Sequence, residues 1–144
     1  MSHETKSVVE FDLEKYLQNS NDVNILIIAF YRGERKMGKY RCLLLYKQHM
    51  KLVEGSYENV VSPNHAMILG LIDTVKHINL HEVNVCIISG IYVGFKGAMR
   101  NKGLYAKEIN ELVGIVEKQG NTISSIAITD GMDMIKKIIK KKCG

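Results

Sequence analysis

Hydrophobic residues are concentrated in short blocks whose composition is typical of β-strands. Two of these blocks, Asn24–Tyr31 and Val83–Ser89, are apolar at nearly every position, which predicts strands buried on both faces of a sheet. A glycine-containing turn separates the first block from the next one, so the chain is expected to return on itself there. The pattern predicts five strands: Asn24–Tyr31, Tyr40–Tyr46, Lys51–Val61, Val83–Ser89 and Ile123–Thr129.

A longer spacing of apolar residues marks three helices. Asn64–Ile78 follows Ser62 and Pro63, a pair in which the hydroxyl can cap the helix and the proline fixes φ. Its apolar residues cover most of the helix circumference, so we expect this central helix to lie between two layers, packed on the sheet. Two amphipathic helices follow, Tyr105–Gly120 and Met132–Lys142, the second with a row of lysines facing outward.

The remaining segments define the ends of the domain. Met1–Ser7 is predicted to be a loose tail, and Val8–Leu17 either a short helix or an arm that covers the sheet. Between the fourth strand and the next helix, Gly90–Gly97 is predicted to be a short helix or a loop. We therefore expect one α/β domain over residues 23–144, preceded by an N-terminal tail or short helix over residues 1–22.

The composition is ordinary for a soluble globular protein. A chain of 144 residues with 46% hydrophobic content is long enough to bury a core without disulfides. No apolar run approaches the roughly 20 residues that span a bilayer, and the first ten residues hold no apolar signal core. Three scattered cysteines fit a reducing compartment. We therefore expect a cytoplasmic protein that makes no contact with membranes.

Three motifs stand at the junctions between these elements. Ser62–Leu69 is similar to the sequence Thr-Asn-Asn-Arg followed by an apolar residue, Glu and Leu, and Ser89–Val93 is similar to Asp-Ser-x-Tyr-Val. Met132–Ile135 carries an aspartate at the start of the last helix. With the order of elements, these motifs resemble the ribonuclease H family over roughly Asn24–Lys142. The resemblance implies an α/β ribonuclease H-like fold. Its five-stranded mixed sheet would have the first three strands antiparallel and the later two parallel to the first, flanked by helices.

The resemblance also implies where catalytic carboxylates would stand. That family's chemistry uses two divalent metals held by acidic side chains at four places. Non-acidic residues occupy three of these places, and acids remain only near the fourth: Ala29 (or Phe30), Met67 and Ser89 are the degenerate positions, and Asp133 and Asp130 are the remaining acids. One or two carboxylates cannot hold a metal pair, so we expect no cofactor. Mg²⁺ enters only if another acid, such as Asp73, Glu54 or Glu34, rebuilds the site.

Positive charge suggests a different use for the fold. The net charge is +5, and basic residues cluster on the first hairpin, around the turn at 100–103 and along the last helix. In ribonuclease H-like proteins a basic segment in the middle region helps to hold a hybrid duplex. The resemblance therefore implies the following nucleic-acid-binding residues: Arg100, Lys102, Lys96, Lys107 and His65. The alternative is that these lysines only solvate helix faces.

Three functions remain open from the sequence. The first is a catalytically degenerate ribonuclease H-like domain that binds an RNA–DNA hybrid or duplex. The second is a protein-interaction or dimerisation module that uses the apolar Gly90–Met99 stretch. The third is a divergent metal-dependent nuclease that uses Asp130, Asp133 and a further acid. A steep salt dependence of binding favours the first, a salt-insensitive dimer the second, and magnesium-dependent cleavage the third.

Overall fold

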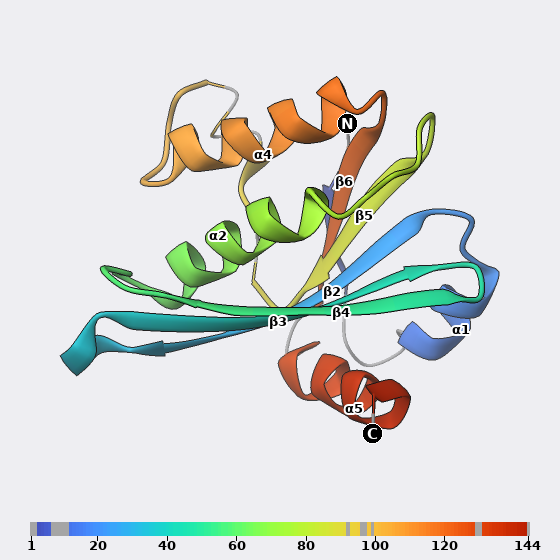
Figure 1. Ribbon diagram of the computed structural model, residues 1–144, viewed down its shortest axis with the longest axis horizontal. Helices are drawn as coiled ribbons and strands as arrows, with labels where there is room; N and C mark the ends of the chain where they lie inside the picture. The colour runs from blue at the N-terminus through green and yellow to red at the C-terminus, as the bar shows by residue number, and fades with distance from the viewer. Residues whose placement is uncertain are drawn as a thin grey trace.

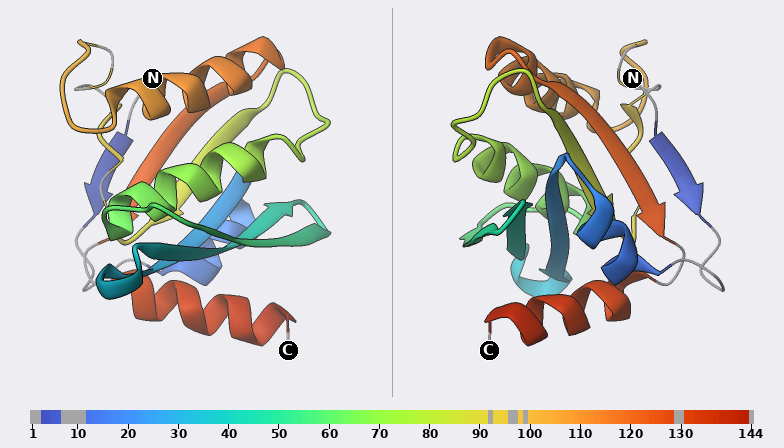
Figure 2. Two further views of the ribbon diagram at one scale, coloured as in Figure 1. Left: turned by 60° about the vertical axis from the view of Figure 1, so that its left-hand side comes forward. Right: turned by 90° about the vertical axis from the view of Figure 1, so that its right-hand side faces the viewer.

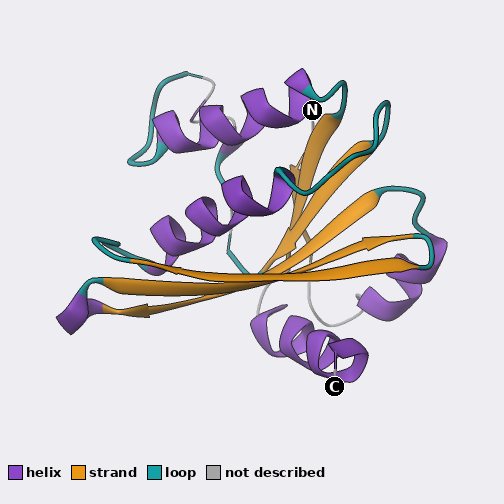
Figure 3. Cartoon of the chain, in the orientation of Figure 1, coloured by secondary structure: helices purple, strands orange, loops and turns teal. Residues whose placement is uncertain are grey.

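A mixed β-sheet forms the centre of the computed structural model, with helices on both faces (Figures 1 and 3). The structure describes residues 3–6, 12–91, 93–95, 98, 100–128 and 131–143. Over these residues the sheet has six strands in the order β1-β6-β5-β2-β3-β4. Their bounds are β1 (His3–Lys6), β2 (Val23–Arg32), β3 (Met37–Tyr46), β4 (His49–Tyr57), β5 (Asn84–Ser89) and β6 (Thr122–Ile128).

The directions of five strands confirm the sequence-based prediction. β2 pairs antiparallel with β3, and β3 pairs antiparallel with β4, whereas β5 pairs parallel with β2 and β6 pairs parallel with β5. β2 is buried from Val23 to Ala29, as its continuous apolar sequence predicts. The third strand begins and ends earlier than expected, at His49–Tyr57 instead of Lys51–Val61.

β1 was not predicted. The expected loose tail is wrong for His3–Lys6, because these residues pair parallel with Ser125–Ile128 of β6 (Figure 2). Backbone pairing at a sheet edge requires no apolar sequence, so the polar sequence HETK gave no strand signal.

The helical segments with described bounds are α1 (Leu13–Asn19), the 3₁₀ turn η2 (Gly33–Arg35), α2 (Pro63–Val75), α4 (Ala106–Lys118) and α5 (Gly131–Cys143). α1 confirms the short-helix alternative for the described part of Val8–Leu17, and its first turn is capped by Asp12, whose Oδ1 accepts a hydrogen bond from Lys15 N at 3.0 Å. α2 begins as predicted, with Ser62 Oγ accepting a hydrogen bond from His65 N at 3.0 Å.

The two faces of the sheet carry separate hydrophobic cores. α2 packs on β2 and β3, which confirms that the central helix is packed on the sheet, and it contacts α4, which packs on β6 at the same face (Figure 1). Alternate residues of β2 point to opposite faces, so Ile25 and Ile27 pack towards α2, whereas Leu26 and Ile28 pack towards α5 and α1. Leu71 of α2 is completely buried in the first core.

A glycine lets the sheet and α2 approach closely. A Cβ built on Gly70 would lie only 2.5 Å from Cγ of Tyr40, so the tyrosine ring rests directly on the helix backbone at this position. This contact brings the tyrosine hydroxyl of β3 alongside the next turn of α2.

No helix in the described part of the chain has the length and apolar character needed to cross a bilayer.

Candidate nucleic-acid interface

The three positions at which the resemblance implied lost metal ligands are buried. Ala29 and Met67 belong to the core between the sheet and α2, with exposed fractions of 6% and 2%. Ser89 is 1% exposed, and its hydroxyl donates a hydrogen bond to the Ile91 carbonyl at 2.6 Å. All three side chains therefore have structural roles at the places where the resemblance implied metal ligands.

The structure brings the ends of these elements together. A Cβ built on Gly90, the residue after β5, would lie 3.2 Å from the backbone nitrogen of Met132 in the first turn of α5. Ala29 of β2 and Met132 line the same hollow. Asp133 is exposed in that first turn but does not line the hollow, and Asp130 lies outside the described residues. Among the residues that the structure describes, no group of three or more histidines, cysteines and acids is placed to hold a metal ion.

The other acids considered from the sequence have different partners or positions. Asp73 accepts hydrogen bonds from two tyrosines, Tyr40 at 2.9 Å and Tyr57 at a shorter distance. Glu54 forms an ion pair with Arg41 at 2.8 Å. Glu34 is exposed in η2. Asp73 and Glu54 are therefore engaged within the α2–β3–β4 part of the fold.

The first feature of the interface is a hollow of about 740 Å³ beside the β2–β3 hairpin, called the hairpin hollow below. Among the described residues, its lining includes three basic side chains and no carboxylate: these lining residues are Ala29, Phe30, Tyr31, Arg32, Arg35, Met37, Lys39, Pro63 and Met132. Arg32, Arg35 and Lys39 are exposed, and within the described chain none of them forms an ion pair. Their charges are therefore available to an anion.

The second feature is a hollow of about 700 Å³ between the start of α2 and the loop before α4, called the Tyr105 hollow. Lys102, Tyr105 and the 83% exposed Leu104 contribute to it. No acid is found among the described residues that line this hollow, which are Ser62, Pro63, Asn64, Ile91, Val93, Gly94, Lys102, Gly103, Leu104, Tyr105 and Ile109. Pro63 lines both hollows, so they meet at the N-terminal end of α2.

The predicted binding residue His65 packs against Tyr105, which lines the Tyr105 hollow. Its ring stacks on Tyr105 with the ring centroids 5.2 Å apart and the planes 8° from parallel. Its Nδ1 accepts a hydrogen bond from Val61 N at 3.2 Å, and the Tyr105 hydroxyl bonds to Ser62 Oγ at 2.6 Å. The imidazole therefore positions Tyr105 beside the capped end of α2.

The remaining predicted cations lie near this hollow. Lys102 lines the Tyr105 hollow, and Arg100 and Lys107 are exposed on either side of it in the sequence. Lys96 lies outside the described residues. The turn that carries Arg100 and Lys102 has positive φ at Asn101 (54°) and Gly103 (94°), conformations that asparagine and glycine tolerate.

Most described apolar side chains of the stretch Gly90–Met99 are buried, and Ile91 is partly buried. Val93, Phe95 and Ala98 are 4%, 1% and 1% exposed and belong to the core on the α2 side of the sheet. Burial removes these three side chains from any contact with a partner.

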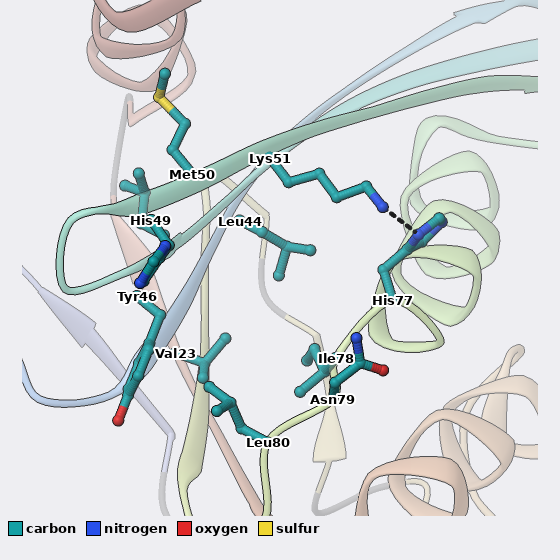
Figure 4. A pocket seen from close by; sticks show the side chains of 11 residues that line it. Val23, Leu44, Tyr46, His49, Met50, Lys51, His77, Ile78, Asn79 and Leu80 are labelled. Atoms are coloured by element: carbon teal, nitrogen blue, oxygen red, sulfur yellow. Dashed lines mark hydrogen bonds between the residues drawn. The ribbon is translucent and has the colours of Figure 1, made fainter.

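A smaller hollow of about 260 Å³ lies at the other end of α2, between the β3–β4 turn and the segment after the helix. Its lining is mostly apolar, with Val23, Leu44 and Leu80 among the labelled side chains in Figure 4. Lys51 Nζ lies 3.1 Å from His77 Nδ1 across its rim (Figure 4). It lies apart from the two hollows that meet at Pro63 and shares no lining residue with them.

Sequence reasoning did not identify the hairpin hollow as a site, although it noted the basic cluster on the first hairpin. The missing information was the register, which sets Phe30 opposite Lys39 and Arg32 opposite Met37. The sequence did contain one signal of this site: the alternation of side chains along a strand puts Phe30 and Arg32 on the same face of β2.

Comparison with known proteins finds no protein-family model that matches this sequence and no curated protein that matches it.

Proposed function

We propose that this chain is a catalytically degenerate ribonuclease H-like domain that binds nucleic acid, an RNA–DNA hybrid or a duplex, mainly through the phosphate backbone. One observation carries the proposal: the hairpin hollow and the Tyr105 hollow meet at Pro63, and the described residues that line them include four basic side chains and no carboxylate. The basic residues are Arg32, Arg35, Lys39 and Lys102.

The strand order supports the ribonuclease H-like part of the proposal. Read from β2 onward, the first three strands are antiparallel and the next two are parallel to the first, with α2 on one face and α5 on the other. This is the arrangement that the resemblance implied. The buried, non-acidic side chains of Ala29, Met67 and Ser89 support the absence of two-metal catalysis.

Electrostatics supports a nucleic-acid partner. A phosphate backbone presents regularly spaced negative charges, and each cation that neutralises one releases a condensed counterion. Exposed arginines and lysines without acidic neighbours can make such contacts whether or not the catalytic acids are present. Two helix N-termini, at Pro63 and Met132, border the same surface and add partial positive charge.

The test is a salt titration of binding. Fluorescence anisotropy should detect binding of a labelled RNA–DNA hybrid and a DNA duplex at low salt, with an affinity that falls steeply as salt rises. The Arg100→Ala, Lys102→Ala double variant should bind more weakly. On duplex DNA, its slope of log K against log salt should flatten by about 0.9 for each phosphate that the substitutions leave without a cation.

The matched control is the Lys137→Ala, Lys140→Ala double variant, which removes the same charge from exposed positions of α5 that line neither hollow. It should keep most of the wild-type slope. Equal effects of the two double variants would indicate a response to net charge alone, and no binding at low salt to either probe would overturn the proposal.

A further inference from the structure

We infer that the hairpin hollow binds one unpaired nucleotide, with the base against Phe30 and the phosphate between Arg32, Arg35 and Lys39. This inference rests on the proposed nucleic-acid binding and assigns a ligand to one part of that surface. The same chemistry, a base joined to a phosphate, is present in a free nucleotide and in the single-stranded end of a longer strand.

The register of the hairpin places the groups side by side. Phe30 pairs with Lys39 across β2 and β3, so the two side chains stand next to each other on one face. Arg32 is two residues further along β2 and therefore points to the same face. Arg35 lines the hollow from η2. A ring and three cations thus surround one volume.

Phe30 is exposed although the preceding β2 residue on the same face is covered. Ile28, two residues earlier, is 4% exposed and packs in the core with α5, whereas Phe30 is 41% exposed. Among the large hydrophobic side chains that are exposed in the described chain, Phe30 is the one aromatic residue; the others are Met50, Val61 and Leu104. An exposed aromatic ring among cations is the arrangement on which single-stranded bases stack.

The ammonium group of Lys136 lies over the Phe30 ring. Lys136 Nζ of α5 lies 5.3 Å from the centre of the Phe30 ring, in a cation–π contact. Lys136 is exposed, so an incoming base can displace its ammonium at little cost. The displaced ammonium stays beside the hollow and adds to the positive charge that the phosphate meets.

The size and the surroundings fit a nucleotide. A volume of about 740 Å³ lies within the range of small-molecule sites. The two acids nearest in sequence to the lining residues, Glu34 and Asp133, do not line the hollow. Stacking accepts any base, and phosphate contacts carry no sequence information, so the site should discriminate weakly among bases.

The experiment uses a tryptophan as reporter. The chain contains no tryptophan, so Phe30→Trp places a single indole in the hollow while keeping a ring for stacking. Its emission is followed while three probes are added: a blunt hybrid duplex, the same duplex with a short single-stranded overhang, and a free nucleoside monophosphate. We expect quenching by the overhang probe and none by the blunt duplex, and quenching by the monophosphate only at much higher concentration.

Affinity measurements with two further variants complete the test. Phe30→Leu should remove the roughly tenfold gain in affinity that the overhang probe has over the blunt duplex, both measured on the same variant. Met50→Leu, at an exposed position of β4 outside the hollow, should change neither affinity. Thermal unfolding of each variant confirms that it is folded.

The outcomes separate this inference from the proposed function. Blunt-duplex binding without any gain from the overhang overturns the nucleotide site and leaves the proposed function standing. Quenching by the free monophosphate alone, without binding of either duplex, overturns the proposed function and identifies the free nucleotide as the ligand. No quenching by any probe overturns the nucleotide site.

Discussion

The Tyr40 hydroxyl of β3 donates a hydrogen bond to Asp73 Oδ2 of α2 at 2.9 Å. Tyr57 of β4 donates to the same oxygen, and its ring stacks on that of Tyr40 with the centroids 6.1 Å apart. One carboxylate therefore joins the central helix to two strands. An acid that could have been mistaken for a catalytic residue holds together the part of the fold that carries Pro63.

Replacing Asp73 should destabilise the protein without changing its surface charge near either hollow. Asp73→Ala leaves the buried Tyr40 hydroxyl without its acceptor, a loss of roughly 1–3 kcal/mol in the free energy of unfolding. Urea denaturation measures this loss. Tyr40→Phe removes the hydroxyl together with its need for an acceptor and should cost less; a larger cost for Tyr40→Phe would contradict this role of Asp73.

Alkaline pH should weaken the same junction. Burial, followed by the hydrogen bond to Asp73, raises the pKa of both Tyr40 and Tyr57 above the ordinary value of 10.0. The unfolded chain therefore loses these protons at lower pH than the folded chain, and the stabilisation is complete below pH 10.0 and falls as pH rises beyond it. Urea midpoints measured at increasing pH should decline above that point. The decline should be shallower in the Tyr40→Phe, Tyr57→Phe double variant.

Truncation of the central helix should be severe. Leu71 is 0% exposed in the core, so Leu71→Ala should lower the free energy of unfolding by roughly 2–5 kcal/mol. Val61→Ala, at a position that is 56% exposed, is the matched apolar truncation and should cost much less. Similar losses in the two variants would mean that α2 is not the packed centre of the domain.

Thiol chemistry should distinguish the cysteines. Cys42 is buried, and burial raises the pKa of its thiol to about 12, whereas Cys143 is exposed near the end of α5. A thiol-reactive reagent should therefore label Cys143 quickly in the native protein, and Cys42 only after denaturation. Mass spectrometry of the labelled peptides checks the assignment, and Cys143→Ser should remove the fast phase.

Catalysis provides a further test. With magnesium or manganese, the purified protein should not cleave an RNA–DNA hybrid above a no-protein control, because Ala29, Met67 and Ser89 occupy three of the four places at which the resemblance implies metal ligands. Cleavage that disappears in Asp133→Asn would instead support a divergent nuclease.

Local sequence patterns predicted the parts of the fold that depend on burial. The continuous apolar run of β2 and the Ser62 cap of α2 each specify their element without reference to distant residues. β1 was missed because its polar residues gain order only from the edge of β6. The hairpin hollow was missed because Phe30 and Lys39 become neighbours only through the strand register, and Met132 joins them from the far end of the chain.

The burial of Ala29, Met67 and Ser89 also determines what reversing their chemistry would require. A carboxylate introduced at any of these places would lose most of its hydration and would have to remain protonated or find a cation. The stability of a variant with acids at all three positions would therefore depend on metal: the variant would be less stable in a chelator than with a divalent ion bound. Ala29, Met67 and Ser89 place no charge in the core, so these three positions need no divalent ion to remain buried.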